Sequence, residues 1–274
     1  RSINQAEINQ QLNLITTEKR GDGFSVANPY YPRTESSDHP LPKLRSAKIN
    51  DVIIENPEGY SDPHEGYTIT EEGIKFFQQP EVTQWYSDIT RNGKRAQEVC
   101  AVEFVPGSQT NYRMKTFSSK DEALIAGWTI THQYQCGTCS TLQDLAVYIG
   151  IPNQTGPISA CTSQARGDYN KLKSVKQCII EAVGFTPMCA ESWSYNGVHT
   201  GSECGKICFA ERGKPLVVDK KTGQLNSCLW CDEKTSGPGF KYSAGRTRRG
   251  SGLGSAILRP NDKLFYEADH SQYF

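Results

Sequence analysis

The sequence predicts an α+β fold, a small mixed or antiparallel sheet packed with several helices, with a disulfide-rich C-terminal half and a Pro-rich N-terminal segment. Three observations predict it. Runs of strand-forming residues fall between residues 98 and 133, stretches with helical apolar spacing follow them, and nine of the ten cysteines lie after residue 135. We expect two regions: an N-terminal helix plus an extended wrapping segment over 1–95, and a cysteine-rich core domain over 96–274.

The first region is turn-rich. A thin apolar stripe predicts a helix over 1–20, and six X-Pro pairs over 24–66 predict extended chain that wraps the surface. Within that stretch only 51–55 is typical of a strand. Short helices are expected over 70–78 and 81–89.

The core begins with strand patterns. Residues 98–105 are apolar on both faces, and 111–117 return after a Pro-Gly turn, which predicts a hairpin. Ser119 with Glu122 forms a capping box for a short helix that ends at Gly127. Residues 128–133, rich in β-branched side chains, then form a further strand.

The strand over 128–133 leads through a short cysteine-bearing turn, the elbow 136–139, into a helix. Ser140 is expected to cap this helix with Gln143 completing a capping box, and apolar residues recur at i, i+3, i+4 and i+7 from Leu142. Gly150 is expected to end it in a left-handed conformation.

Later elements are mainly helical. An amphipathic helix over 170–183 ends at Gly184, and Thr186-Pro187 begins another, whose glycines predict a break near Asn196-Gly197. A hairpin is expected from strands 215–219 and 224–230, and a last strand over 256–258.

Composition indicates the compartment. Ten cysteines suit an oxidising environment, and Asn153-Gln154-Thr155 is an N-glycosylation acceptor. Because the first residue is Arg1, a signal peptide is expected upstream. We therefore expect a glycoprotein that is secreted or that resides in the lumen of the secretory pathway. Thirty basic residues balance thirty acidic ones, which argues against nucleic-acid binding, and no apolar run is long enough for membrane insertion.

The elbow is the predicted site. A thiol at a helix N-terminus faces unpaired amides and the positive end of the helix dipole, which favours the thiolate. We expect Cys139, with Cys136 beside it, to act as a nucleophile. His132, at the end of the preceding strand, is a candidate base. The alternative interpretation is that both cysteines are halves of structural disulfides.

Two short resemblances favour chemistry at the elbow. Gln133-x-x-Cys136-Gly137-x-Cys139-Ser140 resembles the nucleophile segment of papain-like cysteine proteases, followed by His199 and Asn226-Ser227 in that family's order. The resemblance implies that Cys139 attacks a carbonyl, that Gln133 helps hold the oxyanion, and that His199 acts as base.

The second resemblance is to thioredoxin-like oxidoreductases. These proteins place Cys-Gly-x-Cys between a strand and a helix, as Cys136 to Cys139 are placed here, and present a later proline before an apolar hairpin, as Pro215 is placed. It implies a redox-active pair.

Two other patterns concern ligands. The pairs Cys136-x-x-Cys139 and Cys228-x-x-Cys231 have the local spacing of zinc knuckles, but an 89-residue gap separates them, so we predict no metal and no cofactor. In a glycine-containing loop, Arg246, Arg248 and Arg249 are candidates to bind a carboxylate, sulfate or phosphate; the alternative is a solvated loop or a processing site.

The leading functional hypothesis is a secreted enzyme with a cysteine-centred site for acyl transfer, hydrolysis or addition to an activated carbonyl, acting on a small molecule or peptide. Two alternatives stay open: a thiol–disulfide oxidoreductase using Cys136 and Cys139, and a non-catalytic secreted binding glycoprotein with structural cysteines only. The oligomeric state does not follow from the sequence.

Overall fold

The structure is a computed structural model. It describes residues 48–49, 52–53, 97–104, 106, 112–151, 153–253, 255, 257, 266, 268 and 270. In the first region only a pair of two-residue strands is described, β1 (Lys48–Ile49) and β2 (Val52–Ile53). The predicted helices 1–20, 70–78 and 81–89, the wrapping segment and most of the strand 256–258 lie outside the described residues.

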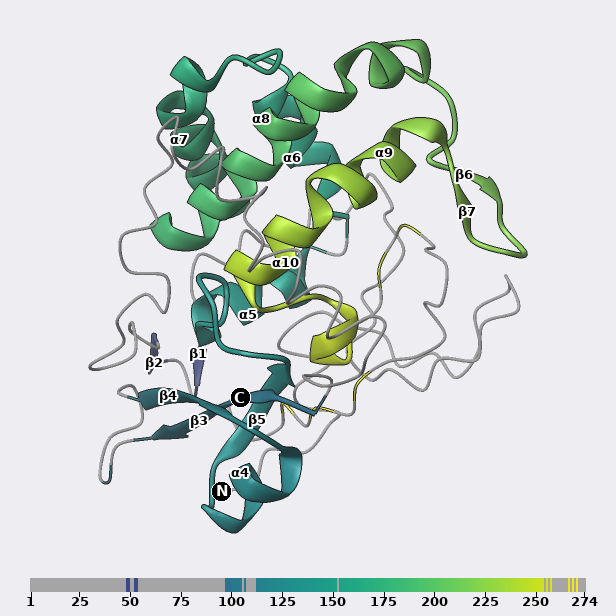
Figure 1. Cartoon of the computed structure of the whole chain (residues 1–274). Helices are drawn as coiled ribbons and strands as arrows, with labels where there is room; N and C mark the ends of the chain where they lie inside the picture. Colours follow the sequence, from purple (N-terminus) through teal and green to yellow (C-terminus); the bar gives the residue numbers. More distant parts are fainter. Residues whose placement is uncertain are drawn as a thin grey trace.

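A three-stranded antiparallel sheet forms one end of the described core (Figure 1). Its strands are β3 (Val99–Phe104), β4 (Tyr112–Phe117) and β5 (Thr129–Gln133), in the order β4-β3-β5. The central strand β3 carries four consecutive buried residues, as its doubly apolar pattern predicted. Helix α4 (Lys120–Ile125) joins β4 to β5 and begins at the predicted cap, where the Ser119 hydroxyl accepts the Glu122 amide.

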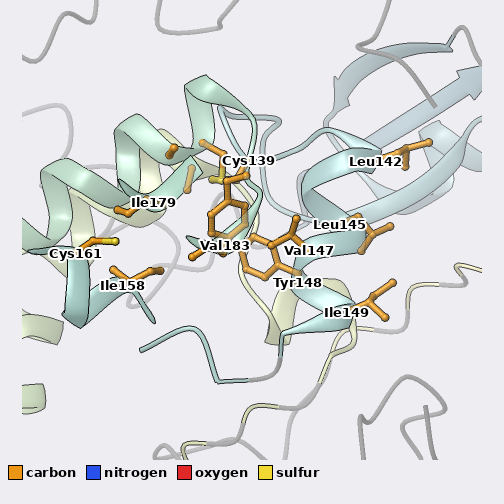
Figure 2. Packing of buried hydrophobic residues seen from close by; sticks show 14 of the residues in the cluster. Cys139, Leu142, Leu145, Val147, Tyr148, Ile149, Ile158, Cys161, Ile179 and Val183 are labelled. Carbon is orange, nitrogen blue, oxygen red and sulfur yellow. A yellow bond between two sulfur atoms is a disulfide. The ribbon is translucent and has the colours of Figure 1, made fainter. Parts of the chain in front are cut away.

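Helix α5 (Leu142–Gly150) connects the sheet to the helical part. It starts one residue later than expected, because Thr141 caps it and Ser140 is used elsewhere. At its other end Gly150 is still helical, and the extended residue Ile151 ends it. Its apolar side chains enter the main core with residues of α6 and α7, and Figure 2 shows Tyr148 and Val183 in this cluster.

Helices gather at the other end of the described core (Figure 1). They are α6 (Thr155–Thr162), the short 3-10 turn η2 (Tyr169–Lys171), α7 (Leu172–Val183) and α8 (Pro187–Ala210). The α7 helix ends as predicted, at Gly184 with a φ of 92°. The α+β fold class is thus confirmed.

The predicted break in α8 is wrong, because this helix runs uninterrupted for 24 residues. Its glycines serve close packing. A Cβ at Gly197 would collide with the Thr162 side chain of α6, and one at Gly201 would lie 2.9 Å from the Gly167 backbone nitrogen. The missing side chains therefore let α8 approach its neighbours, which compensates for their low helix propensity.

After α8 the chain forms a hairpin and two helices. Strands β6 (Val217–Asp219) and β7 (Gln224–Leu225) pair, and α9 (Ser227–Thr235), α10 (Gly237–Ala244) and the 3-10 turn η3 (Arg249–Ser251) follow. The expected strand 224–230 is too long. Asn226 caps α9 by accepting the Leu229 amide, so the chain turns helical directly after Leu225.

All ten cysteines are paired. One bridge joins β3 to the elbow, one joins the elbow to α8, one joins α6 to α7, and two join α8 to α9. We call the last two the outer staple (Cys204–Cys231) and the inner staple (Cys208–Cys228). The remaining three are Cys100–Cys136, Cys139–Cys189 and Cys161–Cys178. Each therefore links elements that pack together, and the disulfide-rich second half is confirmed.

Candidate functional site

The elbow sulfurs are cystine sulfurs. Cys139 is bonded to Cys189 of α8, and Cys136 to Cys100 of β3. Both cysteines are buried. The structure thus corrects two hypotheses: Cys139 is not a free thiolate, and Cys136 and Cys139 are not bonded to each other as a redox pair. Instead, each of the two cysteines is half of a disulfide to a different partner, which agrees with the alternative interpretation as structural disulfides.

Two backbone amides of the elbow have partners inside the protein. The Thr138 amide donates to the Ser243 carbonyl at 2.9 Å, and the Cys139 amide donates to the Ala244 carbonyl at 3.0 Å. Gly137 has no room for a side chain, because a Cβ there would collide with residues 243–245. The end of α10 therefore closes the elbow through backbone contacts.

His132 is near the elbow, as predicted, but hydrogen bonds hold it in a structural position. Its Nδ1 lies 2.8 Å from the Gln133 carbonyl oxygen and its Nε2 lies 2.7 Å from Ser140 Oγ, which also accepts the Gly137 amide. This pattern fits a neutral imidazole that donates from Nδ1 and accepts at Nε2. Burial lowers the pKa of His132 well below 6.5, which also favours the neutral imidazole. Gln133 is the last residue of β5 and pairs with Val99.

Arg246 binds the protein's own backbone, which corrects its predicted role in ligand binding. Its side chain is fully buried, 0% exposed. All five guanidinium N–H groups have an acceptor at 2.6–3.1 Å: two on Thr131, one on Ser251, and the Cys139 and Ser140 carbonyls. A planar five-donor group thus fixes the elbow to β5 and η3.

Arg248 and Arg249 are placed differently. Arg248 Nη1 donates to the Tyr148 carbonyl and, at 3.1 Å, to the Ile151 carbonyl, so it satisfies the C-terminal end of α5. Arg249 begins η3, and its backbone carbonyl accepts the Tyr266 amide. Anion binding by these two arginines stays a prediction.

His199, the base in the protease resemblance, belongs to a polar cluster between α8 and the α9–α10 junction. Its Nδ1 lies 2.8 Å from Ser236 Oγ, and Thr200 Oγ1 bonds to Asp232 at 2.5 Å. Burial lowers the pKa of His199, and the nearby Glu203 carboxylate opposes this. Its hydrogen-bond partner is a serine hydroxyl, and the Cys139 sulfur is occupied by Cys189. Asn226, third in that resemblance, is a helix cap.

Sequence reasoning missed a buried carboxylate. Asp144 accepts hydrogen bonds from the Thr141 and Thr186 hydroxyls and the Thr186 amide, at 2.6–2.9 Å. It therefore joins the start of α5 to the start of α8. Burial raises the pKa of Asp144 to about 6. The sequence signal was the Thr-x-x-Asp spacing of an N-cap, three residues apart, one step beyond the Ser140 cap that we expected.

Sequence reasoning also missed an open cavity at the hairpin. A cavity of about 380 Å³ lies between the β6–β7 turn and the start of α9, lined by Thr222, Gln224, Leu225, Ser227 and Trp230. The indole of Trp230 is 50% exposed. Figure 1 shows this hairpin at the edge of the helical end, beside α9.

The four cysteines of the two Cys-x-x-Cys pairs are all engaged in bridges to other partners, so they do not offer zinc ligands in this state. Over the described part of the chain, no group of three or more His, Cys, Asp or Glu residues is arranged to hold a metal ion. Asn153 lies in the short connection between α5 and α6.

Fold and site together define a disulfide-bridged α+β protein with a closed elbow and an open cavity beside its stapled helices. The model of a family of unknown function (DUF8771) matches residues 172–267, which is 96 of the 274 residues. The match begins at α7, includes both staples and the cavity, and leaves out the sheet and the elbow. Neither the curated proteins nor the solved structures contain a match.

Proposed function

We propose that this chain is a secreted binding protein whose cysteines are all structural. The observation that carries the proposal is that all ten cysteines form five bridges. Several disulfides in one chain are typical of extracellular proteins, since the cytosol keeps thiols reduced. Among the described residues, no helix has the length and apolarity required to cross a membrane.

The surroundings of the elbow support binding over thiol catalysis. A thiolate at Cys139 would require reduction of a bridge whose two sulfurs belong to fully buried residues. The Thr138 and Cys139 amides and the Arg246 guanidinium already have acceptors within the protein, so they are not available to a substrate at the elbow. Scaffolds of this kind hold their loops rigid, which lowers the entropic cost of binding a ligand.

Glycosylation at Asn153 is part of the proposal. Asn153 lies in the short connection between α5 and α6, and the residue is partly exposed. Chain made in a mammalian secretory host should shift to lower mass on treatment with an N-glycosidase, and Asn153→Gln should remove that shift. An unglycosylated secreted chain would remove this part of the proposal only.

The test is a thiol count on protein from that host. The chain is unfolded in guanidinium without reductant and treated with N-ethylmaleimide, and a reduced sample serves as the control that should take up ten labels. We expect no label before reduction and a soluble, secreted product. Stoichiometric labelling of Cys139 or Cys136 before reduction would overturn the proposal and restore the enzyme hypothesis.

A further inference from the structure

We propose that the cavity beside Trp230 binds an uncharged pyranose sugar, as a monosaccharide or as the end of a glycan. This inference rests on the proposed function and names the ligand class of that binding protein. The volume of the cavity, about 380 Å³, is at the lower end of the range for small-ligand sites. Such a volume suits one or two sugar rings.

The lining is uncharged and mixed in character. Gln224 and Ser227 contribute an amide and a hydroxyl, Leu225 contributes a small apolar surface, and Trp230 contributes an aromatic one. The Thr222 hydroxyl accepts the Gln224 backbone amide at 3.3 Å and so belongs to the turn. Hydroxyls and amides both donate and accept, as sugar hydroxyls do. A pyranose ring also has a face made of C–H groups, and burying that face against an indole removes apolar surface from water. The lining therefore matches both sides of a sugar.

The indole is oriented for this contact. On a helix, side chains lean toward the N-terminus, so Trp230 leans over the first turn of α9, where the cavity lies. Lys234 comes one turn later, and its Nζ lies 4.7 Å from the centre of the indole ring. The ammonium group therefore contacts the ring from the following turn of the helix, and Trp230 is still 50% exposed.

The walls of the cavity are rigid. The Asp219 carboxylate accepts the Lys221 amide at 2.8 Å and fixes the hairpin turn. Asn226 joins the hairpin to α9, because its side chain donates to the Pro215 carbonyl at 3.1 Å and its oxygen caps the helix. The inner staple begins at Cys228, the residue after Ser227, and holds this end of α9 on α8. A preformed cavity loses little entropy when a ligand binds.

A peptide side chain is a less suitable occupant. Of the lining residues only Leu225 and Trp230 are apolar, and Leu225 is 7% exposed because it packs in a small cluster with Leu229 and Ile257. An apolar anchor would thus offer no hydrogen-bond partner to the Gln224 amide and the Ser227 hydroxyl.

The experiment is saturation-transfer NMR on the full chain from the secretory host, treated with an N-glycosidase beforehand. The probes are the methyl glycosides of glucose, galactose, mannose, N-acetylglucosamine and xylose, and acetylated Phe and Leu amides, each up to 20 mM. Trp230→Ala tests the site. Phe209→Ala is the matched control, because this aromatic is 75% exposed and does not line the cavity.

We expect at least one glycoside to bind the wild-type chain, with affinity reduced at least tenfold in Trp230→Ala and unchanged in Phe209→Ala. Gln224→Ala should weaken binding severalfold, since it removes hydrogen bonds and leaves the indole. Circular dichroism confirms that the variants are folded. Absence of binding by every glycoside, equal binding by Trp230→Ala, or Trp230-dependent binding by the amides alone would each overturn the inference. The thiol count on the same sample separates this failure from failure of the proposed function.

Discussion

The three glycines on one side of α8 allow a sharp test of the helix packing. Gly197, Gly201 and Gly205 are spaced four residues apart, yet their surroundings differ. A Cβ at Gly205 meets nothing within 4 Å, whereas a Cβ at Gly197 would lie 2.8 Å from Thr162 Cβ and closer still to its methyl group. Alanine at these positions should therefore change stability in opposite directions.

The magnitudes follow from two competing effects. Replacing Gly by Ala inside a helix stabilises it by about 0.8–1 kcal/mol. Gly205→Ala should show this gain alone. At Gly197 overpacking costs about 1–3 kcal/mol, because Thr162 is β-branched and has few rotamers to move into. Gly197→Ala should thus lower the free energy of unfolding by about 1 kcal/mol net, roughly 2 kcal/mol below Gly205→Ala.

The assay is equilibrium unfolding in guanidinium without reductant, followed by tryptophan fluorescence and circular dichroism. Two further variants sharpen it. Gly201→Ala should cost more than Gly197→Ala, because its Cβ would meet the Gly167 backbone. Thr162→Ser, which lacks the methyl group, should return part of the loss when combined with Gly197→Ala. If Gly197→Ala proves as stabilising as Gly205→Ala, then α8 does not pack against α6 as described.

Three other predictions concern the bridges, the buried arginine and pH. Converting either staple to an alanine pair should lower the free energy of unfolding by about 2 kcal/mol, and converting both should lower it by about 6 kcal/mol. The double loss exceeds the sum of the two single losses, because once one staple is closed the other restricts only about seven further residues. Additive losses in chemical unfolding would contradict this. Arg246→Met should lower the free energy of unfolding by about 3–5 kcal/mol. Arg246→Lys should recover little of this loss, since the fixed planar set of five donors is lost in both variants. Unfolding midpoints within experimental error of the wild type would refute this prediction. Because burial lowers the pKa of His132, its imidazole stays neutral in the folded chain, whereas the same residue in the unfolded chain gains a proton below about pH 6.5. For this residue the free energy of unfolding should therefore fall by up to about 1.4 kcal/mol for each pH unit of acidification. Asp144, whose pKa in the folded state is about 6, acts in the opposite sense, because the folded state takes up its proton first as the pH falls below 7. The His132 contribution is therefore the difference between the wild type and His132→Gln, in which the loss of stability from pH 7 to 6 should be smaller.

Local signals in the sequence predicted much of the fold. The strand patterns, the Ser119 cap and the Gly184 C-cap depend on residues within one or two turns of each other, and each predicted element is present. Predictions failed where a local sequence signal is compatible with two structures. A glycine inside a helix predicts a break when nothing is known of its neighbours, but Gly197 is explained by Thr162, 35 residues earlier in the chain.

Predicting the candidate site required knowledge of distant residues even more than predicting the fold did. Cys139 does lie at the start of a helix, as predicted, but whether it is a nucleophile depends on Cys189, 50 residues later. The amides of the elbow and the charge of Arg246 looked available in the sequence because Ser243, Ala244 and Thr131 are remote from them along the chain. Disulfide pairing and burial are set by tertiary contacts, and one sequence does not specify them.

The central claim is that the elbow sulfur is structural, and a peptide map of the unreduced secreted chain tests it most directly. Free thiols are blocked first, the chain is digested at acid pH to prevent exchange, and the linked peptides are sequenced by mass spectrometry. We predict that Cys139 is recovered linked to Cys189 and Cys136 linked to Cys100. Recovery of Cys139 as a blocked thiol, or linked to Cys136, would contradict the account.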